Sequence, residues 1–402
     1  MHPYTPQVVN AVLQRSGSLF AEAIAVHAAN LRSGIAGSRI LVIGAGGSIG
    51  AAFVKVLAPR NPAALHLVDL SENNLVRVVR DLHAEGISPH GEFASFAVGF
   101  DEPEFHALLA AMPPYDFILN FAALKHVRSE RDPFTAMRLL RVNVLANHAL
   151  LQRVANRPLR RYFCVSSDKA VNPASLMGAS KAFMERVCLA QADTVPFTSA
   201  RFANVAFSDG SLLQSFCQRL DAGQALAGPS DVRRYFISHQ EAGELCLLAC
   251  FIGGNREIFT PELAAAKDLK TFPEIAEIVL HARGLKPRYC QSEDEAIELA
   301  RRRDPSSPEW PCFFAPSSTA GEKPFEEFHA PDEAVVHGRL PNIAVITKPR
   351  MTPAPVLAEA LHTLEEWRLT GAWEHQALFG LVQSVIPEFQ HLESPANLDQ
   401  KL

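Results

Sequence analysis

An acid and an amine stand side by side at the end of an apolar run in this chain. Asp168 and Lys169 directly follow Ser166 and Ser167, and a second amine, Lys181, comes after them at helical distance. Carboxyl and amine side chains are groups that general acid and base catalysis uses. The sequence therefore predicts a proton-transfer centre at this point of the chain.

A glycine-rich turn far upstream fits a dinucleotide. Gly44, Gly47 and Gly50 stand between an apolar run and a helical pattern, and Asp69 closes the next apolar run. Glycines permit a tight turn and the close approach of a pyrophosphate, whose charge is met by free N–H groups and the helix dipole. An acid at the position of Asp69 accepts hydrogen bonds from the adenosine ribose and repels a 2′-phosphate, which favours NAD over NADP. A plain turn explains three glycines equally well, but the strand, helix and acid around them favour the cofactor.

The elements that position these motifs alternate between strands and helices. Such alternation requires right-handed crossovers and a doubly wound parallel sheet. After Ala200 the alternation loosens and prolines become frequent, which is typical of a smaller cap. We therefore predict an α/β, Rossmann-type doubly wound parallel sheet with a smaller C-terminal substrate-binding cap. The expected strands are 39–43, 65–68, 93–98, 117–121 and 161–166, and the expected helices are 49–58, 75–86, 102–111 and 133–156.

The chain divides into four expected parts. A helical segment covers 1–37, an NAD-binding Rossmann domain covers 38–200 with contributions to about residue 260, a substrate-binding portion covers 201–330, and a helical extension covers 331–402. In that extension we expect helices at 354–369 and 373–385. No function is assigned to the first and last parts.

Composition excludes several classes of protein. The chain of 402 residues is 48% hydrophobic and 20% charged with a net charge of −5, as in a globular protein without a general basic footprint for nucleic acid. The seven cysteines are scattered and never form Cys-x-x-Cys, so they read as reduced core residues of a cytoplasmic protein rather than metal ligands. No apolar run is long enough to span a membrane.

With these motifs in place, the chain resembles the extended short-chain dehydrogenase/reductase superfamily over roughly residues 38–330. Within it, the chain resembles the nucleotide-sugar 4,6-dehydratases of polysaccharide and amino-sugar biosynthesis, which typically act on UDP-N-acetylglucosamine. The segments that carry the resemblance are 44–50, 120–127, 143–144, 166–173, 177–181, 201–205, 234–236 and 321–327.

The resemblance implies a reaction in which NAD oxidises the sugar C4 hydroxyl and the hydride later returns to C6 as water leaves. Lys169 fits the base that takes the C5 proton, and Asp168 fits the acid that assists the departure of the C6 hydroxyl. Ser167 is expected to contact the C4 oxygen and Lys181 the nicotinamide ribose. The superfamily's catalytic tyrosine is replaced by Met177, whose thioether is not a useful proton acceptor. Which of Asp168, Ser167 through water, or Lys181 takes the C4 hydroxyl proton stays open.

We also expect a homo-oligomer, with the helix pair after the fourth strand as a candidate interface.

The resemblance also implies two sets of ligand contacts. The expected cofactor contacts are Gly44, Gly47, Ser48, Ile49, Gly50, Asp69, Ala122, Ala123, Lys125 and Lys181, and the expected sugar-nucleotide contacts are Lys125, Asn204, Arg233, Arg234 and Glu322.

Two other functions are compatible with the sequence. A nucleotide-sugar 4-epimerase would keep NAD and the diphosphate contacts, but it normally needs the tyrosine that Met177 replaces. A catalytically silent NAD-binding scaffold is favoured by the missing tyrosine and disfavoured by the intact Asp168–Lys169 pair.

Overall fold

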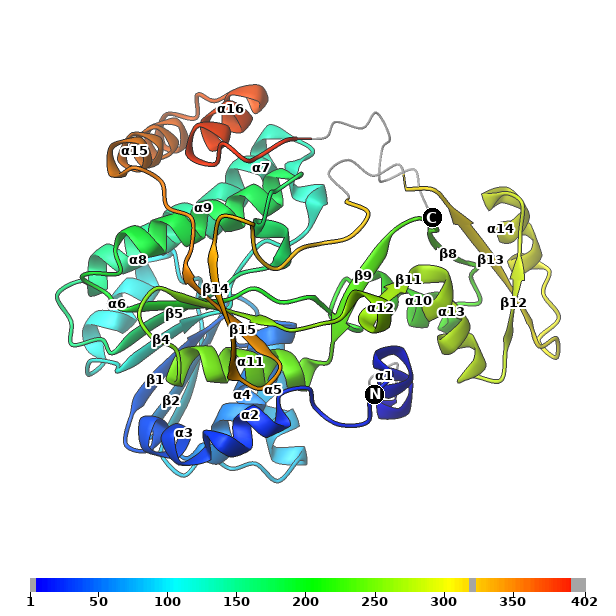
Figure 1. Cartoon of the computed structure of the whole chain (residues 1–402), viewed down its shortest axis with the longest axis horizontal. Coiled ribbons are helices and arrows are strands. Elements are labelled where there is room, and N and C mark those ends of the chain that lie inside the picture. Colours follow the sequence, from blue (N-terminus) through cyan, green and yellow to red (C-terminus); the bar gives the residue numbers. More distant parts are fainter. Residues whose placement is uncertain (1–4, 318–322, 392–402) are drawn as a thin grey trace.

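The computed structural model describes residues 5–317 and 323–391, and its largest element is a nine-stranded sheet (Figure 1). Seven strands are parallel, in the order β3-β2-β1-β4-β5-β6-β10. This order, with helices on both faces, is the doubly wound Rossmann arrangement, so the predicted fold class is confirmed. The strands are β1 (Arg39–Ile43), β2 (Ala64–Asp69), β3 (Glu92–Ala97), β4 (Phe117–Asn120), β5 (Arg161–Val165), β6 (Phe197–Ala200) and β10 (Glu257–Pro261).

Two helical layers cover the sheet because its central strands are apolar on both sides. In β1, for example, Leu41 faces one helical layer and Val42 the other. One layer contains α3 (Ala28–Ile35), α4 (Ser48–Leu57), α5 (Glu72–Ala84) and α11 (His239–Phe251). The other contains α6 (Pro103–Ala111), α7 (Pro133–Leu140), α8 (Ala146–Val154) and α9 (Leu176–Ala190). The strands and helices predicted up to residue 166 are all present, with ends shifted by a few residues.

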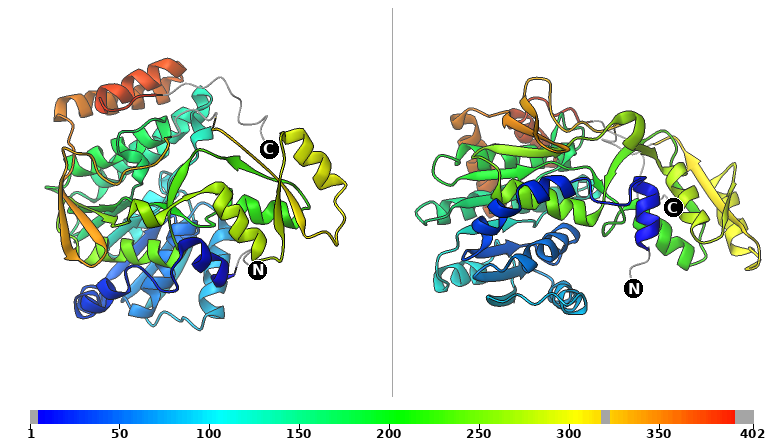
Figure 2. Two further views of the ribbon diagram at one scale, coloured as in Figure 1. Left: turned by 45° about the vertical axis from the view of Figure 1, so that its right-hand side comes forward. Right: turned by 60° about the horizontal axis from the view of Figure 1, so that its bottom comes forward.

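A second, smaller lobe lies beside the carboxyl ends of the strands (Figures 1 and 2). In the described residues it has two three-stranded sheets, β11-β9-β7 and β12-β13-β8. The N-terminal helix α1 (Pro6–Leu13) packs in this lobe's core, against α13, whereas α2 (Ala21–Val26) and α3 lie on the large sheet. The lobe's strands are β7 (Asn204–Val205), β8 (Leu226–Pro229), β9 (Arg233–Ile237), β11 (Leu269–Thr271), β12 (Lys286–Tyr289) and β13 (Glu309–Ala315), and its helices are α10 (Leu212–Asp221), α12 (Ala265–Asp268), α13 (Phe272–His281) and α14 (Glu293–Arg301).

The prediction of a helical C-terminal extension is wrong for its first part. Residues 334–348 form a hairpin of β14 (Ala334–Leu340) and β15 (Ile343–Lys348), and β15 pairs antiparallel with β10. Asn342, in the left-handed region at φ 59°, makes the turn between the two strands. The apolar side chains of β15 are buried, so the hairpin extends the core of the large sheet.

The two predicted C-terminal helices are present as α15 (Ala354–Thr370) and α16 (His375–Val385). They lie over α9 as an additional layer (Figure 1), and α16 packs against α7 as well. Leu364 and Val382 are fully buried in this contact. The chain's own C-terminal helices therefore cover part of the helix pair that the sequence suggested as an interface.

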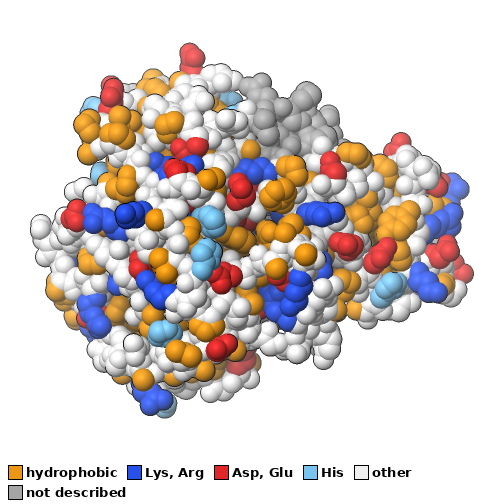
Figure 3. All heavy atoms as spheres, in the orientation of Figure 1, with side chains coloured by type: hydrophobic (Ala, Val, Ile, Leu, Met, Phe, Trp, Pro, Cys, Tyr) orange, Lys and Arg blue, Asp and Glu red, His pale blue; other side chains and the backbone are white. Residues whose placement is uncertain are grey.

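The visible surface is mixed in charge. Figure 3 shows Lys and Arg side chains interspersed with Asp and Glu on the face drawn. Among the described residues, no helix is both long and apolar enough to cross a membrane.

Candidate active site

A cavity of about 280 Å³ lies at the carboxyl ends of β1, β2 and β4. This is the edge where open α/β sheets bind ligands. The cavity wall brings together five of the residues predicted to contact the cofactor: Gly44, Gly47, Asp69, Ala122 and Ala123.

The glycine loop has the geometry of a dinucleotide cradle. Gly44 has φ +71°, and a Cβ there would lie 2.4 Å from the backbone nitrogen of Ala122. A Cβ on Gly50 would lie 2.1 Å from the carbonyl oxygen of Gly44, so this glycine allows α4 to approach the turn. Asp69 accepts a hydrogen bond from the backbone N–H of Gly46 through Oδ2 at 2.9 Å. The residues present therefore fit the pyrophosphate and ribose of a dinucleotide.

The other five predicted cofactor contacts do not line this cavity: Ser48, Ile49, Gly50, Lys125 and Lys181. The hydroxyl of Ser48 accepts a hydrogen bond from the backbone N–H of Asp209 at 2.9 Å. Ser48 lines a different cavity of about 610 Å³, between the N-terminal segment and helices α4 and α11, which contains none of the predicted catalytic residues. Ile49 is partly buried in the first turn of α4 and lines neither cavity.

Another cavity, of about 340 Å³, lies where the small lobe meets the large sheet. Residues 121–124 line the cofactor cavity and residues 125–127 line this one, so the same loop forms part of both walls. The predicted site residues in its wall are Lys125, Lys169, Met177, Asn204 and Arg234.

The Asp168–Lys169 pair is formed within the structure. Lys169 Nζ lies 3.0 Å from Asp168 Oδ1, which also accepts a hydrogen bond from the hydroxyl of Ser167 at 2.8 Å. Asp168 is only 1% exposed and does not line the cavity, whereas Lys169 does. The second carboxylate oxygen of Asp168 is buried without a hydrogen-bond partner. Lys169 is thus the member of the pair that can reach a bound molecule.

Met177 and Lys181 lie one helical turn apart near the start of α9. Burial lowers the pKa of Lys181, and its Nζ donates a hydrogen bond to the carbonyl oxygen of Val165 at 3.0 Å. Met177 is buried in the wall of the 340 Å³ cavity, and its backbone N–H donates to the carboxylate of Glu130 at 3.2 Å. The side chain at 177 provides contact area there and no proton acceptor.

The two arginines predicted to contact the diphosphate, Arg233 and Arg234, lie on opposite faces of β9. Arg234 is buried and lines the cavity, while Arg233 is exposed and points away from it, because successive side chains of a strand face opposite sides. The expectation for Arg233 is therefore corrected. Asn204 lines the cavity, and its Oδ1 lies 3.4 Å from Lys169 Nζ. Glu322 lies outside the described residues.

Lys125 links the cavity to the loop that follows β7. Its Nζ donates to the carbonyl oxygen of Asp209 at 2.8 Å. Burial lowers the pKa of Lys125, and the charge of Asp209 opposes that effect. The side chain is therefore fixed at the border of the two cavities.

Helix α9 packs on the loop 166–173 that follows β5, and a π-helical turn holds the loop that follows β4. A Cβ on Gly178, in the first turn of α9, would lie 2.4 Å from the carbonyl oxygen of Lys169, so the helix packs directly on the loop. In the π-helical segment between α7 and α8, the side chain of Asn143 both donates to and accepts from the backbone of Leu124 at 2.9 Å. π-Helical turns frequently mark functional sites. Here the turn connects the loop after β4 to the helical layer.

A buried ion-pair network connects the loop 166–173 to the start of the C-terminal hairpin. The hydroxyl of Ser166 donates to Glu185 Oε1 at 2.5 Å, and Arg201 bridges Glu185 and Glu333 with contacts of 2.7–2.9 Å. Burial works against the charge of Arg201, but the two carboxylates outweigh it and raise its pKa. Burial likewise opposes ionisation of Glu333, yet the hydrogen bond and charge of Arg201 lower its pKa. The ion pair therefore favours the charged forms of Arg201 and Glu333.

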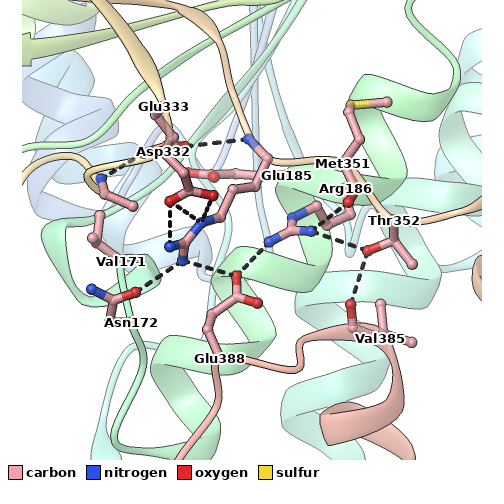
Figure 4. A network of polar contacts seen from close by, with 12 residues as sticks. Val171, Asn172, Glu185, Arg186, Asp332, Glu333, Met351, Thr352, Val385 and Glu388 are labelled. Carbon is pink, nitrogen blue, oxygen red and sulfur yellow. Dashed lines mark hydrogen bonds and ion pairs between the residues drawn. The ribbon is translucent and has the colours of Figure 1, made fainter.

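The C-terminal segment also contacts the end of the loop 166–173 directly. Arg350 Nη1 donates to Asn172 Oδ1 at 2.9 Å, and the backbone N–H of Gln390 donates to the carbonyl oxygen of Pro173 at 3.1 Å. Asn172 has φ +43°, a conformation that non-glycine residues rarely adopt. Figure 4 shows Asn172 and Glu388 pointing toward one another, and Arg350 contacts both. The last part of the chain, which sequence reasoning left without a function, supports this loop.

The wall of the 340 Å³ cavity also contains Lys323 and Glu326, two charged residues of the segment between β13 and β14. Lys323 Nζ donates to the carbonyl oxygen of Val171 at 2.6 Å, and Glu326 is 5% exposed. Their segment has no helical or strand periodicity, so the only sequence signal was its resemblance to a family segment. Within the described part of the chain, no group of three or more His, Cys, Asp or Glu residues is arranged to hold a metal ion.

Comparisons with known proteins agree with this architecture. Residues 40–304 match the model of a family described as polysaccharide biosynthesis protein. The chain is 30% identical over 273 residues to the uncharacterized membrane protein MJ1061 of Methanocaldococcus jannaschii. This alignment covers 66% of this chain and 77% of that relative. It is 26% identical over 358 residues to the probable polysaccharide biosynthesis protein EpsC of Bacillus subtilis, over 83% of this chain and 57% of the relative's length.

A solved structure extends the likeness to the fold. The structure of DesIV from Streptomyces venezuelae, described as a dTDP-glucose 4,6-dehydratase with NAD and TYD bound, aligns with a TM-score of 0.56 and 22% identity. The alignment covers 84% of this chain and 99% of that one.

Proposed function

The chain belongs to the polysaccharide biosynthesis protein family, and on that premise we propose that it is an NAD-dependent 4,6-dehydratase of a nucleotide-diphosphate sugar. The observation that carries the proposal is the position of Lys169, paired with Asp168 and exposed to a cavity that adjoins the glycine-loop cavity. We propose UDP-N-acetylglucosamine as the substrate and a 4-keto-6-deoxy sugar nucleotide as the product.

The glycine-loop cavity would hold the cofactor. Gly44, Gly47 and Asp69 would contact its pyrophosphate and adenosine ribose, and Lys181 its nicotinamide ribose. Bound NAD would supply hydride acceptance from C4 and hydride return to C6. The relative DesIV is described with NAD bound, which supports the choice of this cofactor.

The residues around Lys169 would move the protons. The amine of Lys169 would take the C5 proton once C4 has become a ketone, because a ketone acidifies the neighbouring C–H bond. Ser167, which hydrogen-bonds Asp168, would orient the C4 oxygen. A carboxyl group beside Lys169 would supply the proton with which the C6 hydroxyl leaves as water.

The small lobe would recognise the nucleotide sugar. Arg234 and Asn204 line the cavity and would contact the diphosphate, since a guanidinium group pairs well with phosphate oxygens. Lys125 would lie between cofactor and sugar. The portions 38–200 and 201–330 would thus serve cofactor and substrate, respectively.

A mass measurement tests the proposal. The purified chain is incubated with NAD and UDP-N-acetylglucosamine, and the sugar nucleotide is analysed by mass spectrometry. Loss of one water is the expected result. An unchanged mass with altered stereochemistry would instead indicate a 4-epimerase, and no change with several nucleotide sugars would indicate a silent NAD-binding protein.

A further inference from the structure

The loop 208–211, between β7 and α10, is fastened to two walls of the cofactor site. The backbone N–H of Asp209 donates to the hydroxyl of Ser48 at 2.9 Å, and its carbonyl oxygen accepts from Lys125 Nζ at 2.8 Å. Ser48 is the first residue of α4 and follows the glycine loop, and Lys125 follows the residues 122–124 that line the cofactor cavity. The loop therefore bridges from one wall of the site to the other.

The side chain of Asp209 adds contacts to both lobes. Its Oδ1 accepts from the side-chain amide of Gln214, in α10, at 3.1 Å, and its Oδ2 lies 3.5 Å from Arg77 Nη2, in α5. The same arginine nitrogen donates to the carbonyl oxygen of Gly46 at 3.1 Å. Burial opposes the charge of Asp209, but hydrogen bonding to Ser48 and the charge of Arg77 outweigh it and lower the pKa of Asp209. The carboxylate thus ties the small lobe to the glycine loop.

The backbone of this loop is shaped by two left-handed residues. Gly210 has φ +72°, and a Cβ there would lie 2.8 Å from Cε1 of His126, so the loop packs closely on the segment that follows β4. Phe207 is buried and has φ 60°, which a non-glycine residue keeps only where the surrounding structure holds it. The backbone N–H of Gly210 donates to Gln214 Oε1 at 2.7 Å. The conformation of the loop therefore depends on these contacts.

A dinucleotide that extends from the glycine-loop cavity toward the 340 Å³ cavity must cross the N-terminus of α4. The loop 208–211 is fastened at that N-terminus and at the border of the two cavities. Given the proposed cofactor site, on which this inference rests, we infer that the loop 208–211 is a clasp that must open for NAD to enter or leave. All of its contacts join protein groups, so the same contacts hinder entry and exit. The proposed reaction returns the hydride to the sugar, so a cofactor retained by the clasp serves successive turnovers.

Cofactor exchange rates test the clasp. The parent, Asp209→Ala and Gln214→Ala are mixed with NADH in a stopped-flow instrument, where NADH fluorescence follows binding and displacement by excess NAD follows release. Both substitutions remove contacts of the clasp at residues that do not line the cofactor cavity. We expect the association and dissociation rates to rise together by about tenfold, because the loss of one or two hydrogen bonds shifts an equilibrium by about that factor. The dissociation constant should stay nearly unchanged.

An ion pair at the other end of α10 provides a matched control. Asp221→Ala removes a comparably exposed carboxylate, which pairs with Arg283, and should leave both rates at the parental values. Urea unfolding establishes that the variants are folded. A rise in the dissociation rate alone would overturn the clasp, because it would indicate a direct contact with the cofactor, and parental rates in both loop variants would overturn it as well.

The same experiment separates the clasp from the proposals on which it rests. If the parent binds no NADH, the proposed cofactor site fails and the clasp fails with it. The rates are measured without a sugar nucleotide, so a failure of the proposed dehydration is distinguishable from a failure of the clasp.

Discussion

Removal of one carboxylate from the buried network should destabilise the protein strongly. Arg201 is 4% exposed in its side chain, and its two partners, Glu185 and Glu333, are 3% and 1% exposed. Glu333→Gln keeps the size of the side chain but leaves the guanidinium with one charged partner instead of two. Because the buried guanidinium loses charge-assisted hydrogen bonds, each of which contributes about 1.5–3 kcal/mol, we expect a loss on the order of 3 kcal/mol. That is a large share of the roughly 5–15 kcal/mol that stabilises a typical domain.

A more exposed ion pair between β14 and β10 provides the control for this prediction. Arg339 makes a bidentate contact with Glu257 at 2.6 Å, but the arginine side chain is 37% exposed. Solvent-exposed pairs contribute about 0.2–1 kcal/mol, so Arg339→Gln should cost far less than Glu333→Gln. The free energy of unfolding is measured by urea titration with circular dichroism. Equal losses for the two variants would refute the buried-network account.

The buried Arg201–Glu333 pair also predicts a pH dependence of stability. The native pKa of Glu333 is lower than its ordinary value of 4.5, so the unfolded chain binds this proton more readily than the folded protein does. The stabilisation by the carboxylate is fully present above pH 4.5 and is lost as the pH falls through the lower native pKa. The parent should therefore lose more stability than Glu333→Gln when the pH is lowered from 5 to 3. Parallel curves for the two proteins would contradict this.

Three further substitutions test how the site is held. Gly178→Ala places a methyl group 2.4 Å from the carbonyl oxygen of Lys169 and should lower turnover roughly 100-fold, with NAD affinity unchanged by calorimetry. Gly44→Ala combines a backbone clash with φ +71° and should abolish NAD binding in the same assay, while an unaltered affinity would exclude the glycine loop as the cradle. Arg350→Ala removes the hydrogen bond to Asn172 and should raise hydrogen–deuterium exchange in residues 168–175, which unchanged protection would disprove.

The Rossmann part of the fold was predictable because its signals are local. The apolar strands, the glycine turn and Asp69 follow one another in short segments, each with a period or residue type that has one structural meaning. The hairpin at 334–348 was missed because its pairing partner, β10, is far away in the sequence and its turn contains Asn342 rather than glycine. Long-range pairing of this kind leaves no periodic signal in a single segment.

The candidate site was predictable in its centre and not at its borders. The Asp168–Lys169 pair could be placed because it ends a strand of the parallel sheet. Arg233 was misplaced because the orientation of two adjacent arginines depends on the register of β9, which the sequence does not reveal. The approach of Glu326 to Lys169 joins two loops that are far apart in the sequence, so only the folded structure could show it.

The central claim is that hydride leaves C4 and returns to C6 of the same sugar while water departs. UDP-N-acetylglucosamine deuterated at C4 tests it most directly, with the product analysed by NMR. The account predicts a 4-keto product, lighter by one water, that carries the deuterium at C6. Deuterium retained at C4, or a 4-keto product without the label, would contradict it.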